Sequence, residues 1–397
     1  MKSGDRARRQ PPLSRKAKLI SLAVGIILAW RVSAISIAAA HNDSNKDLVA
    51  ANFAGVSQVA ATVAADQRIN DGDFAGAKAF ATNALSASTI SAASLRDLAL
   101  AEQGIGNWQK AGALFSQNAA LGWRDGPTQL WLAQIFFQMK DYSRAAERLD
   151  AALRLDVPNA ALYDVLDSLA QNQDFAVVMS KRLALNPNWR HFYLGHVGNT
   201  PLPDLQARVI IFNNLKKLKS QATEDEIARV TSGLANLGDL AGARNLWFQA
   251  HSDTTSSIYD PDFKNIGRNR VPFEWSTLPI LGTSLQISSD SNGHAVLHAT
   301  TDGGASGVLL RQTTLLKPGR HTLMVSETGP AAAKKAFGWS IRCMKGKTLL
   351  NTLNLEASSS YQFEVEPNCD AQFIDLRVTS NPDVADKSAY FGGIRVE

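Results

Sequence analysis

An aromatic residue recurs in this chain at intervals of 34 residues. Phe74, Trp108 and Tyr142 each end a short polar turn, GDF, GNW or KDY, and they stand 34 residues apart. A fixed period of this length is typical of repeat proteins, in which every repeat is one supersecondary unit. The spacing therefore predicts stacked pairs of helices, each pair joined by a tight turn.

Alanines repeat in the same register. One set comprises Ala65, Ala99 and Ala133, and a second set, twelve residues later in each repeat, comprises Ala77, Ala111 and Ala145. Small side chains at these positions would let the two helices of a pair approach closely, because the distance between packed helices depends on the residues at the contact. The alternative interpretation is an ordinary helical bundle with alanine-rich packing.

This pattern of small and large residues resembles the tetratricopeptide repeat. The resemblance covers about residues 46–252, is good for the second and third repeats and partial for the first, and lacks the family's terminal proline in its usual place. It implies a short α-solenoid with a groove that holds a peptide or another protein. Each groove candidate also fits a plain solvated residue. The groove-facing positions implied by the family are Asp66, Arg96, Gln103, Gln134 and Gln138.

The amino terminus predicts a membrane address. Residues 1–18 form a basic tail, and residues 19–40 are mostly apolar, with Arg31 as their one charge. This length suffices for one transmembrane helix, and basic residues before such a segment hold that end in the cytoplasm. We expect a single-pass anchor in a bacterial inner membrane with the body in the periplasm. A signal peptide cleaved after Ala38-Ala39-Ala40 is the alternative, and it gives the same destination.

The net charge of +5 does not indicate a nucleic-acid-binding protein. Eight lysines and arginines stand against one aspartate in residues 1–40, so the rest of the chain is slightly acidic. A body without a basic stripe has little means of neutralising phosphates. We therefore expect membrane and protein partners, together with polysaccharide, and no nucleic acid.

After His251 the helical spacing gives way to two-residue alternation. Residues 271–275, 337–343 and 361–365 alternate apolar and polar side chains, and turn signals such as Lys317-Pro318-Gly319 separate such runs. Alternation is typical of antiparallel strands with one buried face. About eight to ten short strands in residues 258–397 predict a β-sandwich or jelly roll. The predicted class is thus multidomain α plus all-β: a transmembrane helix, an α-solenoid and a carboxy-terminal sandwich.

The carboxy-terminal third resembles carbohydrate-binding modules of the galactose-binding-like type. The resemblance is architectural and is carried by the segments YDPDFKN, PFEW, LKPGRHTLMV and SAYFGGIRVE. Similar modules occur with repeats in membrane-anchored envelope proteins linked to exopolysaccharide production. The resemblance implies glycan binding through aromatic faces and a few polar groups. The candidates are Trp275, Tyr390, Arg311 and Arg342, although a solvated sheet surface would show the same polar residues.

The two cysteines fall in this same region. Cys343 closes an apolar run and Cys369 begins one, which could place them on neighbouring strands. An oxidising compartment would allow them to form a disulfide. Free thiols are the alternative.

The sequence contains no motif for phosphate, dinucleotide, zinc or serine-nucleophile chemistry. We therefore expect no cofactor and no metal. The oxygen-rich trio Asp260, Asp262 and Asn265 fits a capped turn better than a calcium site.

Taken together, these features predict a non-enzymatic, membrane-anchored scaffold for envelope polysaccharide biosynthesis or export. Its solenoid would hold a protein of envelope assembly and its sandwich would contact glycan. The alternative is a glycan-processing enzyme, which would need two carboxyl groups roughly 5 to 10 Å apart. Its candidate carboxylates are Glu364, Glu366 and Asp375.

Overall fold

The structure is a computed structural model, and it describes residues 58–87, 90–155, 158–251, 257–289, 293–328, 335–353, 359–380 and 387–397. The predicted basic tail and the apolar segment 19–40 lie outside these residues. Within the described ranges, no helix combines the length and the apolar character that crossing a membrane requires. The chain divides into two compact units. The first comprises residues up to Tyr193 with Ile210–Gln221, and the second comprises Leu194–Val209 with Ala222–Glu397.

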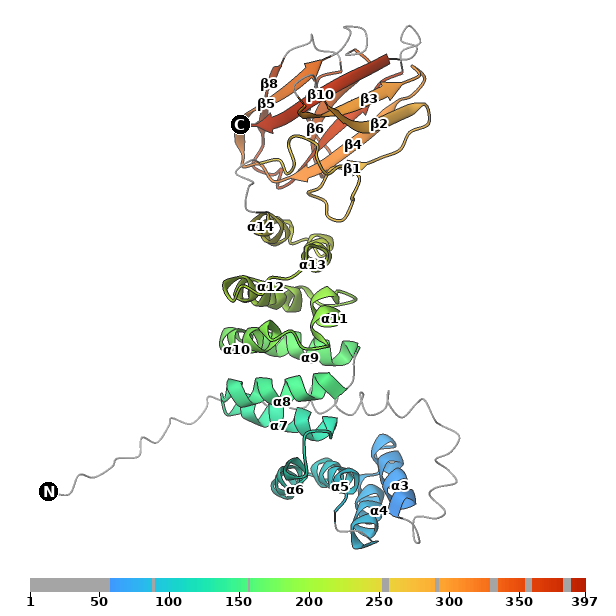
Figure 1. The fold of residues 1–397 in the computed structure, drawn as a ribbon, viewed down its shortest axis with the longest axis vertical. Helices are drawn as coiled ribbons and strands as arrows, with labels where there is room; N and C mark the ends of the chain where they lie inside the picture. Colours follow the sequence, from blue (N-terminus) through green and yellow to red (C-terminus); the bar gives the residue numbers. More distant parts are fainter. Residues whose placement is uncertain are drawn as a thin grey trace, which may run out of the picture. The chain divides into compact units, whose positions relative to one another are not determined.

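The first unit is built from antiparallel helix pairs, as the period predicts (Figure 1). The aromatic of each repeat is the first residue of a second helix, so that Phe74, Trp108 and Tyr142 begin α4, α6 and α8. The turn before each of them contains a residue with positive φ, namely Gly72, Gly106 or Lys140. The helices of the first unit are α3 (Gln58–Asn70), α4 (Phe74–Ala87), α5 (Ala92–Gly104), α6 (Trp108–Ala120), α7 (Gly126–Gln138), α8 (Tyr142–Leu155), α9 (Ala160–Ala170) and α10 (Gln173–Ala184). The residues of α11 (Arg190–Gly195) and α12 (Leu202–Lys217) are divided between the two units.

The repeated alanines are the contact points within the helix pairs. None of the six is more than 2% exposed, and they alternate between the first helices and the second helices of the first three pairs. Ala65 packs with Ala81 and Leu98, and Ala99 packs with Ala111 and Phe115. The helical repeats are therefore confirmed.

The aromatic residues of the three repeats differ in what they pack against and in how far they are buried. Phe74 lies against Gly104, the last residue of α5, and Tyr142 accepts a hydrogen bond from the amide of Asn172 at 3.1 Å. The residue at the matching position for Trp108 is Gln138, the exposed last residue of α7. Trp108 is 62% exposed, whereas Phe74 and Tyr142 are half-buried.

This contact makes the second repeat sensitive to a single methyl group. A Cβ at Gly104 would lie 2.2 Å from Cγ of the Phe74 ring. We expect Gly104→Ala to destabilise the first unit by about 1–3 kcal/mol, because overpacking forces a side chain or helix to shift. The measurement is the urea midpoint of the full chain.

Gly112 provides the matched control for this variant. It lies inside α6, and its added Cβ would meet the Trp131 ring at an ordinary 3.4 Å. Gly112→Ala is expected to be neutral or to stabilise by up to about 1 kcal/mol, since alanine is the better helix former. Equal destabilisation by both variants would contradict the packing role of Gly104.

The second unit contains one more helix pair and the β domain. Helix α13 (Glu224–Asn236) begins with a capping box made by Thr223 and Glu226, and α14 (Leu240–Ala250) follows after a short turn. The described part of the β domain has ten strands in two antiparallel five-stranded sheets (Figure 1). They are β1 (Ser276–Thr277), β2 (Thr283–Ser289), β3 (Ala295–Thr301), β4 (Gly307–Thr314), β5 (Gly319–Thr328), β6 (Phe337–Cys343), β7 (Thr348–Asn351), β8 (Ser360–Val365), β9 (Gln372–Val378) and β10 (Lys387–Val396).

The strand order is β1-β4-β9-β6-β7 in one sheet, which we name sheet A, and β2-β3-β10-β5-β8 in the other, sheet B. Both sheets contribute to one apolar core, to which sheet A gives Trp339 and Ile374 and sheet B gives Leu323 and Phe391. The two-sheet antiparallel domain is confirmed. The runs 337–343 and 361–365 are strands, as their alternation predicts.

The strand predicted at 271–275 is wrong. Val271, Phe273 and Trp275 are all buried, but the backbone forms turns there and the first strand begins at Ser276. Pro272 has no backbone N–H to give to a ladder, and the N–H of Glu274 bonds to the carbonyl of Val271 at 3.1 Å. The alternation therefore reflects side chains that a folded loop buries, Trp275 in the core of the β domain and Phe273 against Phe248 of α14.

Candidate functional site

Two of the predicted groove residues of the first unit contact each other directly. The guanidinium of Arg96 on α5 donates to both carboxylate oxygens of Asp66 on α3, at 2.8 and 3.0 Å. It also reaches Asp97 at 2.8 Å and Asp125, the N-cap residue of α7, at 3.4 Å. One arginine thus links the first helices of three successive repeats.

The burial of this cluster sets its charge state. Burial opposes the charge of Arg96, but Asp97, Asp66 and Asp125 outweigh that effect and raise the pKa of Arg96. Burial raises the pKa of Asp97 well above its ordinary value. Arg96 is therefore a positioning residue that holds α3, α5 and α7 together, while the half-exposed Asp66 presents a carboxylate to solvent.

The three predicted glutamines lie further along these helices. Gln103 is near the end of α5 and has a buried side-chain oxygen that accepts no hydrogen bond from the described residues. Gln134 on α7 is half-buried, and Gln138, the last residue of α7, is exposed. The structure records no side-chain contact that joins these glutamines to the Arg96 cluster within its described ranges. Their amides remain candidates for contact with a partner.

A second charged cluster joins the first two helix pairs through Glu102. Its carboxylate is buried and lies 3.1 Å from Nζ of Lys78, 2.6 Å from Nζ of Lys110 and 2.7 Å from Nδ2 of Asn107. Burial opposes ionisation, but hydrogen bonds from Lys110, Asn107 and Lys78 outweigh it and lower the pKa of Glu102 to about 2. The ionised carboxylate is therefore part of the folded state.

This lowered pKa predicts a pH dependence of stability. A carboxylate with a lowered folded-state pKa stabilises above its ordinary pKa of 4.5, and this contribution is lost as the pH falls toward about 2. We expect Glu102→Gln to cost about 1–2 kcal/mol at neutral pH, a figure reduced because both lysines reach solvent. The free energy of unfolding should differ most between variant and wild type above pH 5 and converge near pH 2.

Glu147→Gln is the control for this prediction. The Glu147 side chain is 42% exposed, and its carboxylate lies 3.7 Å from Arg182. Its loss should change stability by less than about 0.5 kcal/mol at any pH. A pH-independent difference between wild type and Glu102→Gln would refute the electrostatic account of Glu102.

In the β domain, Arg311 and Arg342 come together on the outer face of sheet A. Arg311 on β4 binds both carboxylate oxygens of Asp375 on β9, at 2.7 and 3.0 Å, and Nε of Arg342 on β6 lies 3.4 Å from the same carboxylate. Asp375 is fully buried beneath them. The register explains this meeting, because Arg311 and Ser340 both pair with Asp375 across β9.

Both guanidinium groups also lie over one aromatic ring. The guanidinium carbon of Arg311 is 4.6 Å and that of Arg342 is 4.5 Å from the centre of the Phe373 ring. These distances are within the range of cation–π contacts. Phe373 was not among the sequence candidates. Its spacing of two residues from Asp375 on one strand was the available signal, because such residues share a face.

The other two predicted glycan residues do not join this site. Trp275 is fully buried in the core, and its indole N–H donates to the carbonyl of Asp260 at 2.9 Å, so it has no face to offer a sugar. Tyr390 is on β10 in sheet B and stacks on His298 at 4.4 Å between ring centres. The prediction of Trp275 as a glycan-stacking residue is therefore wrong, and Tyr390 belongs to the opposite sheet.

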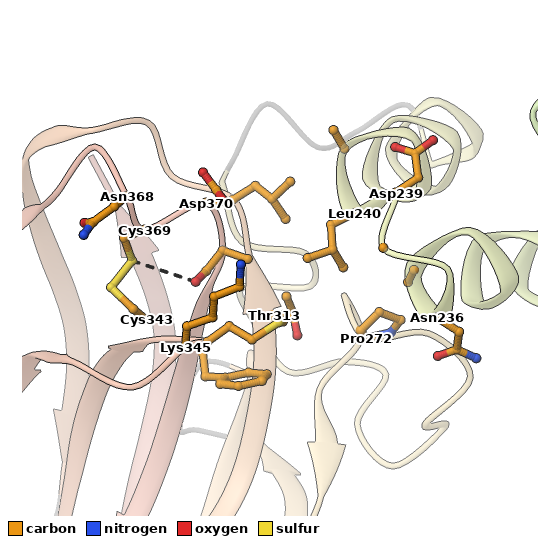
Figure 2. A pocket seen from close by; sticks show the side chains of 17 residues that line it. Asn236, Asp239, Leu240, Pro272, Thr313, Cys343, Lys345, Asn368, Cys369 and Asp370 are labelled. Carbon is orange, nitrogen blue, oxygen red and sulfur yellow. Dashed lines mark hydrogen bonds between the residues drawn. A yellow bond between two sulfur atoms is a disulfide. The ribbon is translucent and has the colours of Figure 1, made fainter. Parts of the chain in front are cut away.

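A cavity of about 680 Å³ lies within the second unit, beside the same outer face (Figure 2). One wall is the connection between α13 and α14, including Leu240, with Pro272 next to it. The other wall includes Thr313 and Phe373 of sheet A, the disulfide and Lys345. The volume is within the range of small-ligand sites. Sequence reasoning missed this cavity because its walls come from segments far apart in the chain.

The disulfide predicted as one alternative is present. Cys343 and Cys369 are bonded, with Cα atoms 5.5 Å apart. The bond joins the end of β6 to the turn that precedes β9, and both cysteines line the cavity.

The carboxylates named for the enzyme alternative are dispersed. Asp375 is held by two arginines in sheet A, Glu364 is on β8 in sheet B, and Glu366 pairs with Lys347. The described residues hold no group of three acidic, histidine or cysteine side chains that fits a metal. Asp260 accepts hydrogen bonds from the backbone of Lys264 and Asn265 at 2.9 and 2.7 Å, which is the geometry of a capped turn.

Comparison with known proteins adds little to this description. No protein-family model matches the chain, and no curated protein matches it. A solved structure of accessory secretory protein 1, 2 and 3 from Streptococcus pneumoniae aligns with 36% of this chain and 96% of its own, at 12% identity and a TM-score of 0.25. A likeness at this score carries no argument about function. The chain is thus defined by its own architecture, helical repeats followed by a two-sheet antiparallel β domain.

Proposed function

We propose that the protein is a non-catalytic, membrane-anchored scaffold of the bacterial envelope. Its helical repeats, of the tetratricopeptide type, bind another protein of envelope assembly, and its β domain, of the carbohydrate-binding type, contacts polysaccharide. The single observation that carries this proposal is the periodic packing of α3 to α8 through buried alanines. Stacked helix pairs present a continuous surface of first helices, which suits an extended partner better than it suits a reaction centre.

The side chains on α3, α5 and α7 support a role in recognition. Arg96 fixes the mutual positions of the three helices, so the surface is preorganised before a partner arrives. Preorganisation lowers the conformational cost of binding. Asp66, Gln134 and Gln138 then supply polar groups that reach solvent.

The amino-terminal sequence supports the cellular setting of the proposal. An apolar segment at residues 19–40 behind a basic tail would tether the body to the outer surface of the inner membrane. A tethered scaffold keeps its partners at the site of assembly. The Cys343–Cys369 bond is compatible with an oxidising compartment such as the periplasm.

Site-specific photo-crosslinking in intact cells tests the protein-binding surface. A photoreactive residue at Gln138 on α7 is expected to give one discrete adduct of the full chain with a second protein. The same residue at Gln117, which is exposed on the second helix α6, serves as the matched control and should give none. Equal adducts from both positions, or none from Gln138, would reject the groove.

The enzyme alternative makes a different prediction for the purified protein. A glycan-processing enzyme would shorten or modify purified polysaccharide in proportion to time. The scaffold should bind it and leave its chain length and reducing ends unchanged. Turnover that is lost in Asp375→Asn, with folding retained, would replace the scaffold by the enzyme.

A further inference from the structure

We propose that the outer face of sheet A binds an acidic polysaccharide whose sugars carry carboxylates, through Arg311, Arg342 and Phe373. This inference rests on the glycan contact of the proposed function and names the class of glycan. The site is built from three neighbouring strands, β4, β9 and β6, which the sheet holds in fixed register.

The charge on this face is local and positive. Residues 258–397 contain 14 lysines and arginines and 14 aspartates and glutamates, so the domain as a whole is neutral. Arg311, Arg342 and Arg377 nevertheless share the outer face of sheet A with one acid, Asp375, because their pairing positions alternate with those of core residues. A neutral domain that concentrates arginine on one face is complementary to an anionic ligand.

Asp375 orients the arginines without consuming their binding capacity. Its carboxylate accepts hydrogen bonds from Nε and one terminal nitrogen of Arg311, whereas from Arg342 it accepts a bond from Nε alone. The two terminal nitrogens of Arg342 have no hydrogen-bond partner among the described residues, and the side chain is 27% exposed. A planar pair of N–H donors matches the two oxygens of a carboxylate.

A second polar group at the same place lacks a partner. Ser340 lies opposite Asp375 on β6 and is only 3% exposed, and its hydroxyl makes no hydrogen bond within the described part of the chain. Buried polar groups in folded proteins are nearly always paired, so an unpaired one calls for an explanation. Because this hydroxyl is itself buried, a hydroxyl or carboxylate of a bound sugar would supply the missing bond only after the side chains that cover Ser340 move.

Phe373 and the cavity provide the apolar part of the site. Sugar rings have weakly apolar C–H surfaces, and binding pockets combine such contacts with a few oriented polar groups. The Phe373 ring lies beneath both guanidinium groups and also lines the 680 Å³ cavity, so the charged site and the cavity are continuous through this one residue. Lys345 adds a further cation to the cavity wall. Successive acidic sugars can therefore occupy the face and the cavity together.

The test is a calorimetric titration of the full chain in detergent with three polymers. Polygalacturonate carries the carboxylates, carboxyl-reduced polygalacturonate has the same backbone without them, and dextran sulfate offers a different anion. We expect polygalacturonate to bind, with an affinity that falls as salt rises, and the other two to bind at least tenfold more weakly. Equal binding of the reduced polymer would overturn the charge argument, and equal or tighter binding of dextran sulfate would overturn carboxylate selectivity.

Three variants test whether this binding depends on Arg342. Arg342→Gln leaves Asp375 paired with Arg311, so the sheet should fold, and it should weaken polygalacturonate binding about tenfold or more because a charge-assisted contact is lost. Arg320→Gln removes the same charge from an exposed position on β5 in sheet B and should bind as wild type does. Arg342→Lys, which keeps the charge without the planar fork, should also be weakened and guards against misfolding of the first variant.

The outcomes separate this inference from the proposed scaffold. If Arg342→Gln binds polygalacturonate as wild type does, the acidic-glycan site is refuted, whatever happens at the helices. If the Gln138 crosslink is absent while the uronate binding follows the variants, the protein partner is refuted and the glycan site stands. Unchanged melting temperatures in all three variants show that the comparison is made on folded protein.

Discussion

Replacing Arg270 by methionine is expected to destabilise the second unit by about 3 kcal/mol, because the buried carboxylate of Glu274 would lose its positively charged partner. Arg270 lies 2.6 Å from Glu274, which is fully buried, and 2.9 Å from Glu224 and 3.3 Å from Asp225 in the first turn of α13. Its backbone carbonyl also accepts the hydroxyl of Ser232 on the same helix. One residue therefore ties the last helix pair to the start of the β domain.

The electrostatics agree with this role. Hydrogen bonds from Arg270 lower the pKa of Glu224 to about 2, and the same partners raise the pKa of Arg270. The effect can be followed as a shift of the urea transition of the full chain, with hydrogen exchange of α13 as the local readout. Opening of α13 before the rest of the unit should accompany the loss.

Two further variants isolate the cause. Arg268→Met removes a neighbouring arginine that is largely exposed and 3.4 Å from Glu224, so it should cost less than about 0.5 kcal/mol. The double variant Arg270→Met with Glu274→Met removes the stranded charge as well and should recover most of the stability. A double variant as unstable as Arg270→Met alone would show that lost packing, and not the unpaired carboxylate, dominates.

Removing the disulfide should have a comparable effect. The bond closes a loop between residues 26 apart in sequence, and the chain-entropy estimate gives about 3–4 kcal/mol of stabilisation for a loop of this size. We expect the double variant Cys343→Ser, Cys369→Ser to lose this amount under oxidising conditions. The measurement is the denaturant midpoint of the full chain at fixed pH.

Reduction of the wild type provides the internal control. Wild type in excess reductant should fall to the stability of the double variant, whereas the variant should not respond to reductant. A wild type that keeps its midpoint when fully reduced would contradict a stabilising role for the bond. Because both cysteines line the cavity, loss of the bond should also weaken binding of ligands there.

The helical unit was predictable because its signals are local and periodic. The 34-residue step located the first residue of α4, α6 and α8 and the buried faces of six helices. Sequence could not show that Arg96 joins Asp66, Asp97 and Asp125, since that meeting depends on how three helices stack. The periodicity also could not show that Trp108 is 62% exposed while its counterparts Phe74 and Tyr142 are half-buried.

The β domain was predictable in class and less so in detail. Alternation located β6 and β8, but it also marked 271–275 as a strand, because a loop that buries every second side chain gives the same pattern. The sequence suggested Arg311 and Arg342 as glycan-binding residues but did not show which side chains they contact. Only the register of β4, β9 and β6 brings them to Asp375 and Phe373, and only the tertiary structure brings the α13–α14 connection to the cavity.

The central claim is that this chain carries two separable binding surfaces, one on helices and one on a sheet. It is tested most directly by measuring both kinds of binding in two variants. One is the double variant Gln134→Ala, Gln138→Ala, and the other is Arg342→Gln. Partner capture is measured as the adduct formed with a photoreactive residue at Gln103 on α5, and polyuronate retention is measured on the purified full chain. The account predicts that the first variant loses the adduct and keeps polyuronate, while the second keeps the adduct and loses polyuronate. The account is contradicted if either variant loses both the adduct and polyuronate binding. It is also contradicted if both variants keep the adduct and polyuronate binding.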